Sequence, residues 1–123
     1  MSSLNEKTND VLQEVLAERE RQDAKWGEQN HPDGTHPGHV QLLINGMQAQ
    51  REATNGLATL GEYARNLTNA LAAVGKLTYS EILWEEVCEA MEEGDPKCLR
   101  EELVQVAAVA VAWVESIDRR GGQ

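Results

Sequence analysis

The sequence predicts an all-α protein, and three features of its 123 residues favour this fold class. Apolar residues recur every three to four positions over long stretches, the spacing that places them on one face of a helix. Segments with strand-like alternation are hard to find, and only 3 prolines interrupt the chain. The apolar share of 41% is mostly Ala, Val and Leu, and Phe is absent, which suits closely packed helices. A chain of this length is expected to form one domain, residues 1–123.

The N-terminal part of the chain is predicted to contain an arm, a helix and a loop. Residues 1–8 are mostly polar and are expected to form a flexible arm. Apolar residues at helical spacing then predict a helix from Asn9 to Lys25 or Trp26. The segment 27–38 is rich in Gly, Pro, Asn and Asp, and is predicted to be a loop, where functional residues are often found.

The middle of the chain is predicted to form two helices. Residues 39–55 are expected to make a separate short helix, although Gly46 interrupts its apolar pattern. A second helix is predicted over Leu57–Val74, where apolar residues recur at helical spacing. Gly75 follows directly and is suited to end that helix, because glycine adopts the left-handed conformation of a C-cap without strain.

Two further helices are predicted near the C-terminus, joined by a short turn. Thr78 and Glu81 have the spacing of a capping box and mark the start of the first helix. Gly94 is placed to end this helix in the left-handed region. Asp95 can cap the second helix, with Pro96 at its first position, where the missing N–H costs nothing. A turn this short makes the two helices antiparallel neighbours.

The last helix is also unusually apolar. From Leu103 to Val114 its only polar residue is Gln105. A helix that is apolar on nearly all sides is buried on several of them, and a domain this small buries only a limited fraction of its surface. A homo-oligomer is therefore expected. Residues 121–123 are expected to form a frayed tail.

Charge and hydropathy exclude several classes of protein. The formal net charge of −10 lacks the basic footprint needed for duplex nucleic acid, and does not favour binding to an anionic membrane surface. The N-terminus has no apolar core of a secretory signal, and the run Leu103–Val114 is too short to span a bilayer. These features predict a cytoplasmic location.

Several other conspicuous residues are expected to have structural roles. Cys88 and Cys98 match no metal-binding spacing and are expected to be reduced, packed side chains. Trp84 and Trp113 lie on apolar helix faces and are expected in the core. Arg100 is expected to pair at the surface with the acidic residue that follows it.

A group of acidic residues lies on the two C-terminal helices. Glu86 and Glu89 are three residues apart and share a helix face, as do Glu102 and Gln105 on the next helix. Carboxylates held this close repel one another, and a hard divalent cation between them removes the repulsion. A solvated acidic face is the plainer alternative, because such faces are common.

The acidic motif resembles that of a known enzyme family. Glu85-Glu86-x-x-Glu89 followed by Glu102-x-x-Gln105 is similar to the signature of the MazG-like all-α nucleoside triphosphate pyrophosphohydrolases. Phage and actinobacterial members of that family also resemble this chain in three other stretches: Glu18-Arg19-Glu20-Arg21-Gln22, Lys25-Trp26-Gly27-Glu28-Gln29 with His31-Pro32, and Glu102 to Val109. The resemblance covers most of residues 11–120, except 39–56.

The resemblance implies a fold, an activity and a cofactor. The fold is a four-helix-bundle-like MazG-type domain that forms a homodimer or homotetramer. The activity is hydrolysis of a ribo- or deoxyribonucleoside triphosphate to the monophosphate and pyrophosphate, which clears or controls nucleotide pools. The cofactor is Mg²⁺ or Mn²⁺.

The resemblance also implies roles for individual residues. Glu86, Glu89 and Glu102 correspond to metal ligands, and Gln105 stands where the family has an aspartate. A neutral amide can coordinate a cation through its oxygen, but it removes one negative charge from the site. Glu85, an unligated carboxylate, is the candidate base that accepts a proton from the attacking water.

Substrate-binding residues are expected where the first helix meets the loop, and they are Gln22, Lys25, Trp26 and His31. Lys25 can contact a phosphate and Trp26 can stack on a base, although Trp26 could equally fill the end of the helix bundle. Three histidines in or beside the loop, His31, His36 and His39, also allow a zinc site, although no cysteine accompanies them.

Two other functions remain open from the sequence. The glutamine at the aspartate position is compatible with a non-catalytic helical module that binds a nucleotide or a protein partner on the same scaffold. A purely structural oligomer is the third alternative, and it predicts no stabilisation by magnesium.

Overall fold

The computed structural model describes residues 3–121, and these form five α-helices and no strand. The helices, in chain order, are α1 Leu4–Trp26, α2 Pro37–Ala53, α3 Leu60–Ala73, α4 Tyr79–Glu92 and α5 Pro96–Gly121. The prediction of an all-α fold is confirmed.

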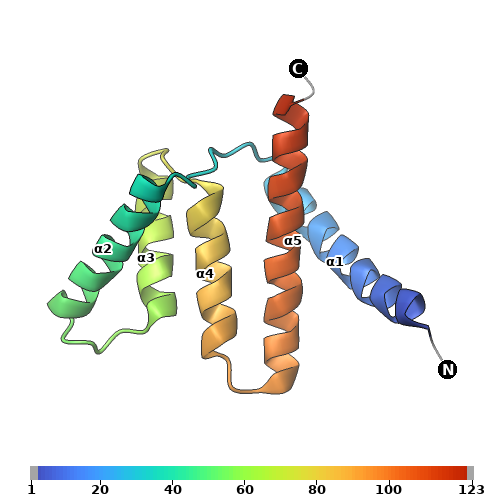
Figure 1. The fold of residues 1–123 in the computed structure, drawn as a ribbon, viewed down its shortest axis with the longest axis horizontal. Helices are drawn as coiled ribbons and strands as arrows, with labels where there is room; N and C mark the ends of the chain where they lie inside the picture. The colour runs from blue at the N-terminus through green and yellow to red at the C-terminus, as the bar shows by residue number, and fades with distance from the viewer. Residues whose placement is uncertain (1–2, 122–123) are drawn as a thin grey trace.

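The five helices are arranged as an open row (Figure 1). The backbones of the helices are neighbours in the order α2, α3, α4, α5, α1, so α4 and α5 form the centre of the row, and side chains of α2 also reach α4. α2 leans away beyond α3, and α1 crosses behind α5 and diverges from it towards the N-terminus. Within the described residues the row does not close on itself. The four-helix-bundle-like MazG-type arrangement therefore stays a prediction.

The helix starts differ from the predicted ones where local caps extend them. Ser3 forms a capping box with Glu6, so α1 begins at Leu4 and the predicted arm is wrong for residues 4–8. His36 accepts a hydrogen bond from the backbone N–H of Gly38, so α2 begins at Pro37 and the loop ends at residue 36. Residues 1–2 of the predicted arm and 122–123 of the predicted tail lie outside the described residues.

The predicted separate helix over 39–55 is confirmed as α2, and the predicted helix over 57–74 is α3. α3 starts three residues later than predicted because the Thr59 hydroxyl accepts a hydrogen bond from the Glu62 N–H at 3.1 Å. Gly75 follows α3 with a φ of 70°, in the left-handed region, as predicted.

The α4–α5 hairpin starts as predicted but turns differently. Glu81 accepts a hydrogen bond from the Thr78 N–H at 3.2 Å, which completes the capping box of α4. Asp95 accepts one from the Lys97 N–H, also at 3.2 Å, and so caps α5. The prediction for Gly94 is wrong, because α4 ends at Glu92, its cap residue Glu93 is extended, and the Glu93 carboxylate accepts a hydrogen bond from the Asp95 N–H.

The core is small and lies mainly where α4 meets its neighbours. Buried apolar side chains include Tyr79, Cys88 and Ala90 of α4 and Ala108 of α5. Burial raises the pKa of the Cys88 thiol to about 11, so it is protonated and unreactive at neutral pH. Cys98 is also free.

The two tryptophans of the C-terminal helices have different environments. Trp113 is half-buried and stacks on Tyr79, with 5.6 Å between ring centroids. Trp84 is 38% exposed, so the prediction that it lies in the core is wrong for the single chain. Its indole N–H contacts the Met47 sulfur at 2.9 Å, but the open row leaves part of the side chain exposed.

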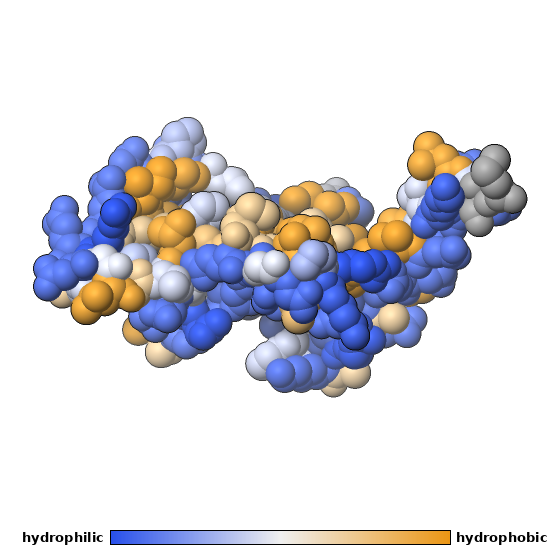
Figure 2. Space-filling model, turned by 90° about the horizontal axis from the view of Figure 1, so that it is seen from below, coloured by the Kyte–Doolittle hydropathy of each residue, from blue (hydrophilic) through white to orange (hydrophobic). Residues whose placement is uncertain are grey.

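The open arrangement leaves much apolar surface exposed. Figure 2 shows hydrophobic residues mainly along the upper side of that view, interspersed with hydrophilic ones. Leu12 and Leu16 of α1 and Val111 and Val114 of α5 are all exposed. None of the described helices is both long and apolar enough to cross a membrane.

Candidate metal centre

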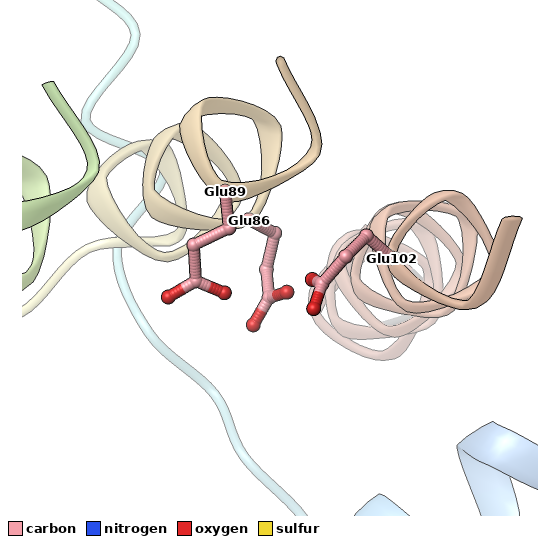
Figure 3. A group of neighbouring side chains, drawn as sticks. All are labelled: Glu86, Glu89 and Glu102. Carbon is pink, nitrogen blue, oxygen red and sulfur yellow. The ribbon is translucent and has the colours of Figure 1, made fainter. Parts of the chain in front are cut away.

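Three carboxylates converge between α4 and α5 (Figure 3). Glu86 and Glu89 project from the same face of α4, and Glu102 projects towards them from α5. One carboxylate oxygen of each lies within 4.8 Å of the other two. The spacing of three residues on α4 and the short turn before α5 produce this arrangement.

The cluster is partly buried and short of hydrogen-bond donors. One oxygen of Glu86 and one of Glu102 are buried and have no hydrogen-bond partner. Burial, and then the charges of Glu89 and Glu102, raise the pKa of Glu86 from 4.5 to about 7. Burial, and then the charge of Glu89, also raise the pKa of Glu102. The cluster is therefore destabilised when all of its carboxylates are ionised.

Arg65 of α3 is the cation closest to one side of the cluster. Its guanidinium lies 3.1 Å from the Glu89 carboxylate and 3.6 Å from that of Glu85. Among residues 3–121, neither Glu86 nor Glu102 forms a salt bridge. A buried carboxylate without a partner is costly, so these two oxygens have the chemistry of ligands for a hard divalent cation.

Glu85, the candidate base, lies at the edge of the cluster beside Arg65. Burial, and then the charge of Glu89, raise the pKa of Glu85, while Arg65 lowers it. A carboxylate whose pKa is raised is a better proton acceptor near neutral pH.

Gln105 lies one turn along α5 from Glu102 and lines a cavity of about 460 Å³ between α1 and α5. Glu18 of α1 lines the same cavity, and its charge contributes to the raised pKa of Glu86. The structure thus brings Glu18 near the cluster, a residue that sequence reasoning did not assign to the site. Its signal in the sequence is its place in the N-terminal stretch that resembles the MazG-like family.

Arg100 also lines this cavity, and its predicted partner is wrong. Its guanidinium donates to both carboxylate oxygens of Glu14 on α1, at 2.9 Å for one of them, instead of pairing with the adjacent acidic residue. The partner comes from another helix because α1 packs along α5.

The predicted substrate residues lie at the opposite end of α5. Gln22 lines a small cavity with Ala112 and Glu115, and His31 lines another with Ser116. Ser116 follows Glu102 by 14 positions, so along the helix axis it is about 21 Å away. Within one chain these residues are not brought to the carboxylates.

Lys25 and Trp26 contact each other at the end of α1. The Lys25 ammonium lies 4.7 Å from the Trp26 ring centroid, in a cation–π arrangement. Trp26 is 60% exposed, so it does not fill the end of a bundle in the single chain.

The three histidines do not gather at one place. His36 caps α2, and His39 lies 2.7 Å from the Glu81 carboxylate. His31 packs with its ring edge towards Tyr79. Among the described residues, three metal-ligating side chains meet at the acidic cluster and not at the histidines, so the zinc alternative has no geometric support.

Comparisons of the chain with protein-family models, with curated proteins and with solved structures gave no match.

Proposed function

We propose that the chain is a metal-dependent nucleoside triphosphate pyrophosphohydrolase, which converts a ribo- or deoxyribonucleoside triphosphate to the monophosphate and pyrophosphate. The observation that carries the proposal is the convergence of Glu86, Glu89 and Glu102, with buried unpartnered oxygens on the first and last of them. The resemblance of the motif to the MazG-like family supplies the reaction.

The three carboxylates fit a magnesium or manganese ion by charge and by donor type, and Glu86 and Glu102 each have a buried oxygen without a partner. Such an ion, when bound, neutralises phosphate charge and acidifies a bound water. Glu86, Glu89 and Glu102 hold it through oxygen, the ligand atom that both ions prefer. Gln105 can supply a further amide oxygen from the next turn of α5.

Glu85 and Arg65 act at the rim of the site. Glu85 accepts the proton of the attacking water, because its carboxylate lies outside the converging group and its pKa is raised. Arg65 contacts both Glu85 and Glu89, so it holds these two carboxylates in place and limits their mutual repulsion. The bond broken lies between phosphorus and a bridging oxygen of the triphosphate.

A homo-oligomer forms part of this proposal. A compact monomer of 13.6 kDa is expected to expose about 6,600 Å², whereas this chain exposes 8319 Å². The excess of about 1,700 Å² is twice what one partner buries in a standard interface, about 800 Å². A second copy that covers the exposed apolar residues of α1 and α5 would close the open row into a bundle.

The test is release of pyrophosphate from each nucleoside triphosphate, with magnesium and with EDTA. We expect release only with magnesium, and at least about 100-fold less for Glu86→Gln and Glu89→Gln. Asp118→Asn is the matched control, because it neutralises an exposed carboxylate on α5 away from the cluster. Full activity of both glutamine variants would show that the site is elsewhere, provided that circular dichroism shows them folded.

A further inference from the structure

A second cavity, of about 400 Å³, lies between the loop at residues 27–36 and the C-terminal end of α5. It is lined by Glu28, Asn30, His31, Ser116, Arg119 and Arg120, among others. Its volume is within the range of small-molecule sites. It is about 21 Å along α5 from Glu102, so it is separate from the carboxylate cluster.

An aromatic stack fixes the position of His31 in this cavity. The His31 ring meets the Tyr79 ring edge-on, with 5.1 Å between centroids, and Tyr79 stacks on Trp113. The Tyr79 hydroxyl donates to the Gln29 carbonyl at 2.8 Å, and the Trp113 N–H donates to Asp33 at 2.7 Å. These contacts hold the loop against α4 and α5.

The Nε2 atom of His31 is buried in this arrangement and has no hydrogen-bond partner. A buried polar atom without a partner is costly, and few occur in a native structure. The contacts that anchor the loop account for the ring's position but not for this nitrogen, which is therefore available to a ligand.

Two guanidinium groups line the same cavity, in a chain whose net charge is −10. Arg119 donates to the Asn30 side chain at 3.0 Å and to the Gln29 carbonyl at 2.9 Å, and lies 3.3 Å from Glu28. Arg120 pairs with Asp33 at 2.5 Å. A guanidinium carries five N–H donors, so both groups keep donors for a further acceptor.

We propose that this cavity binds a phosphate group, with His31 Nε2 and the guanidinium groups of Arg119 and Arg120 as its donors. Phosphate is the anion that suits this set, because it accepts several hydrogen bonds at once and pairs well with planar guanidinium groups. Burial lowers the pKa of His31, so the ring is neutral at pH 7, and its tautomer protonated at Nε2 is the one that can donate to the anion. Glu28, which is 61% exposed on its side chain, can move away from Arg119 when the anion enters.

This phosphate site needs no metal ion, and it is separate from the hydrolase activity proposed above. A free phosphate and the phosphate of a nucleotide share this chemistry. The two sources are separated by comparing inorganic phosphate with a nucleoside monophosphate, where tighter binding of the nucleotide would show that the cavity also contacts the nucleoside.

The experiment is a titration of the folded chain in EDTA at pH 7, followed by NMR of the histidine rings. Inorganic phosphate or the monophosphate is added at constant ionic strength, with sodium chloride as the compensating salt. The His31 ring signals are expected to shift and saturate with a dissociation constant of about 1 mM or lower. His36 and His39 are internal controls, and Glu86→Gln is expected to titrate like the wild type.

Two arginine variants test whether the phosphate binds in this cavity. Arg120→Gln is expected to weaken phosphate binding by about tenfold, because it removes a charge-assisted donor. Arg51→Gln, at an exposed position on α2, is the matched control and should leave binding unchanged. A His31 signal that does not saturate, that shifts equally with chloride, or that responds alike in both arginine variants would overturn the proposal.

Discussion

Replacing Glu86 should stabilise the metal-free protein. This result is counter-intuitive, and it is expected because Glu86 has a strongly raised pKa within the cluster. Burial and neighbouring carboxylates raise the pKa of Glu86 from 4.5 to about 7. Ionising it in the folded state therefore has a cost that corresponds to at most about 3 kcal/mol. Partial exposure to solvent reduces this cost, and about 1–2 kcal/mol is expected for Glu86→Gln.

The pH dependence follows from the sign of the shift. The folded state binds the Glu86 proton more tightly than the unfolded state does, so the cost is absent below pH 4.5. It grows as the pH rises between 4.5 and 7, and it is complete above pH 7. In EDTA at pH 8, Glu86→Gln should therefore melt about 5 °C higher than the wild type, with a smaller difference at pH 5.

Magnesium should reverse this order. At one hundred times its dissociation constant, a ligand that binds only the folded state adds about 2.7 kcal/mol of stability, more than the advantage of about 1–2 kcal/mol expected for Glu86→Gln. The wild type should gain this stability, and Glu86→Gln should gain little. The assay is thermal melting by circular dichroism with Asp118→Asn as control. A Glu86→Gln variant that is less stable than the wild type in EDTA at pH 8, or a difference that does not change with pH, would refute the reasoning.

Three further predictions test other parts of the site and the fold. Gln105→Asp adds a carboxylate one turn from Glu102, so magnesium should bind about tenfold tighter by calorimetry; weaker or equal binding would place Gln105 outside the site. Arg65→Gln removes the cation that contacts Glu85 and Glu89, so the metal-free protein should be less stable at pH 8, and urea titrations that show no loss would contradict this role. Val111→Asp puts a charge on the exposed apolar face of α5, so sedimentation should show a smaller species than the wild type; a wild type that is itself monomeric at all concentrations would contradict the predicted interface.

Local signals in the sequence predicted much of the fold. The Thr78–Glu81 capping box and the Asp95-Pro96 helix start depend on residues close in the chain, and both are present. The Ser3–Glu6 box is an equally local signal, and it explains why a helix replaces the predicted flexible arm over residues 4–8. The start of α2 was harder to predict, because histidine is not among the preferred N-cap residues, yet His36 caps the helix.

In the candidate site, contacts between residues close in the chain could be predicted from the sequence, whereas contacts between distant elements could not. Spacing along one helix places Glu86 beside Glu89, and the short turn brings Glu102 to them. The approach of Glu18 depends on which face of α1 meets α5, which no local pattern specifies. Likewise, the position of His31 near Arg119 depends on how a loop packs 88 residues away in the chain, and periodicity carries no information about that contact.

The most direct test of the central claim is crystallography of the protein with manganese, using the anomalous signal of the metal. Manganese prefers the same oxygen ligands as magnesium and can be located without ambiguity. We predict an anomalous peak about 2.2 Å from carboxylate oxygens of Glu86, Glu89 and Glu102. Peaks elsewhere on the protein, with none between these three side chains, would contradict the proposed metal centre.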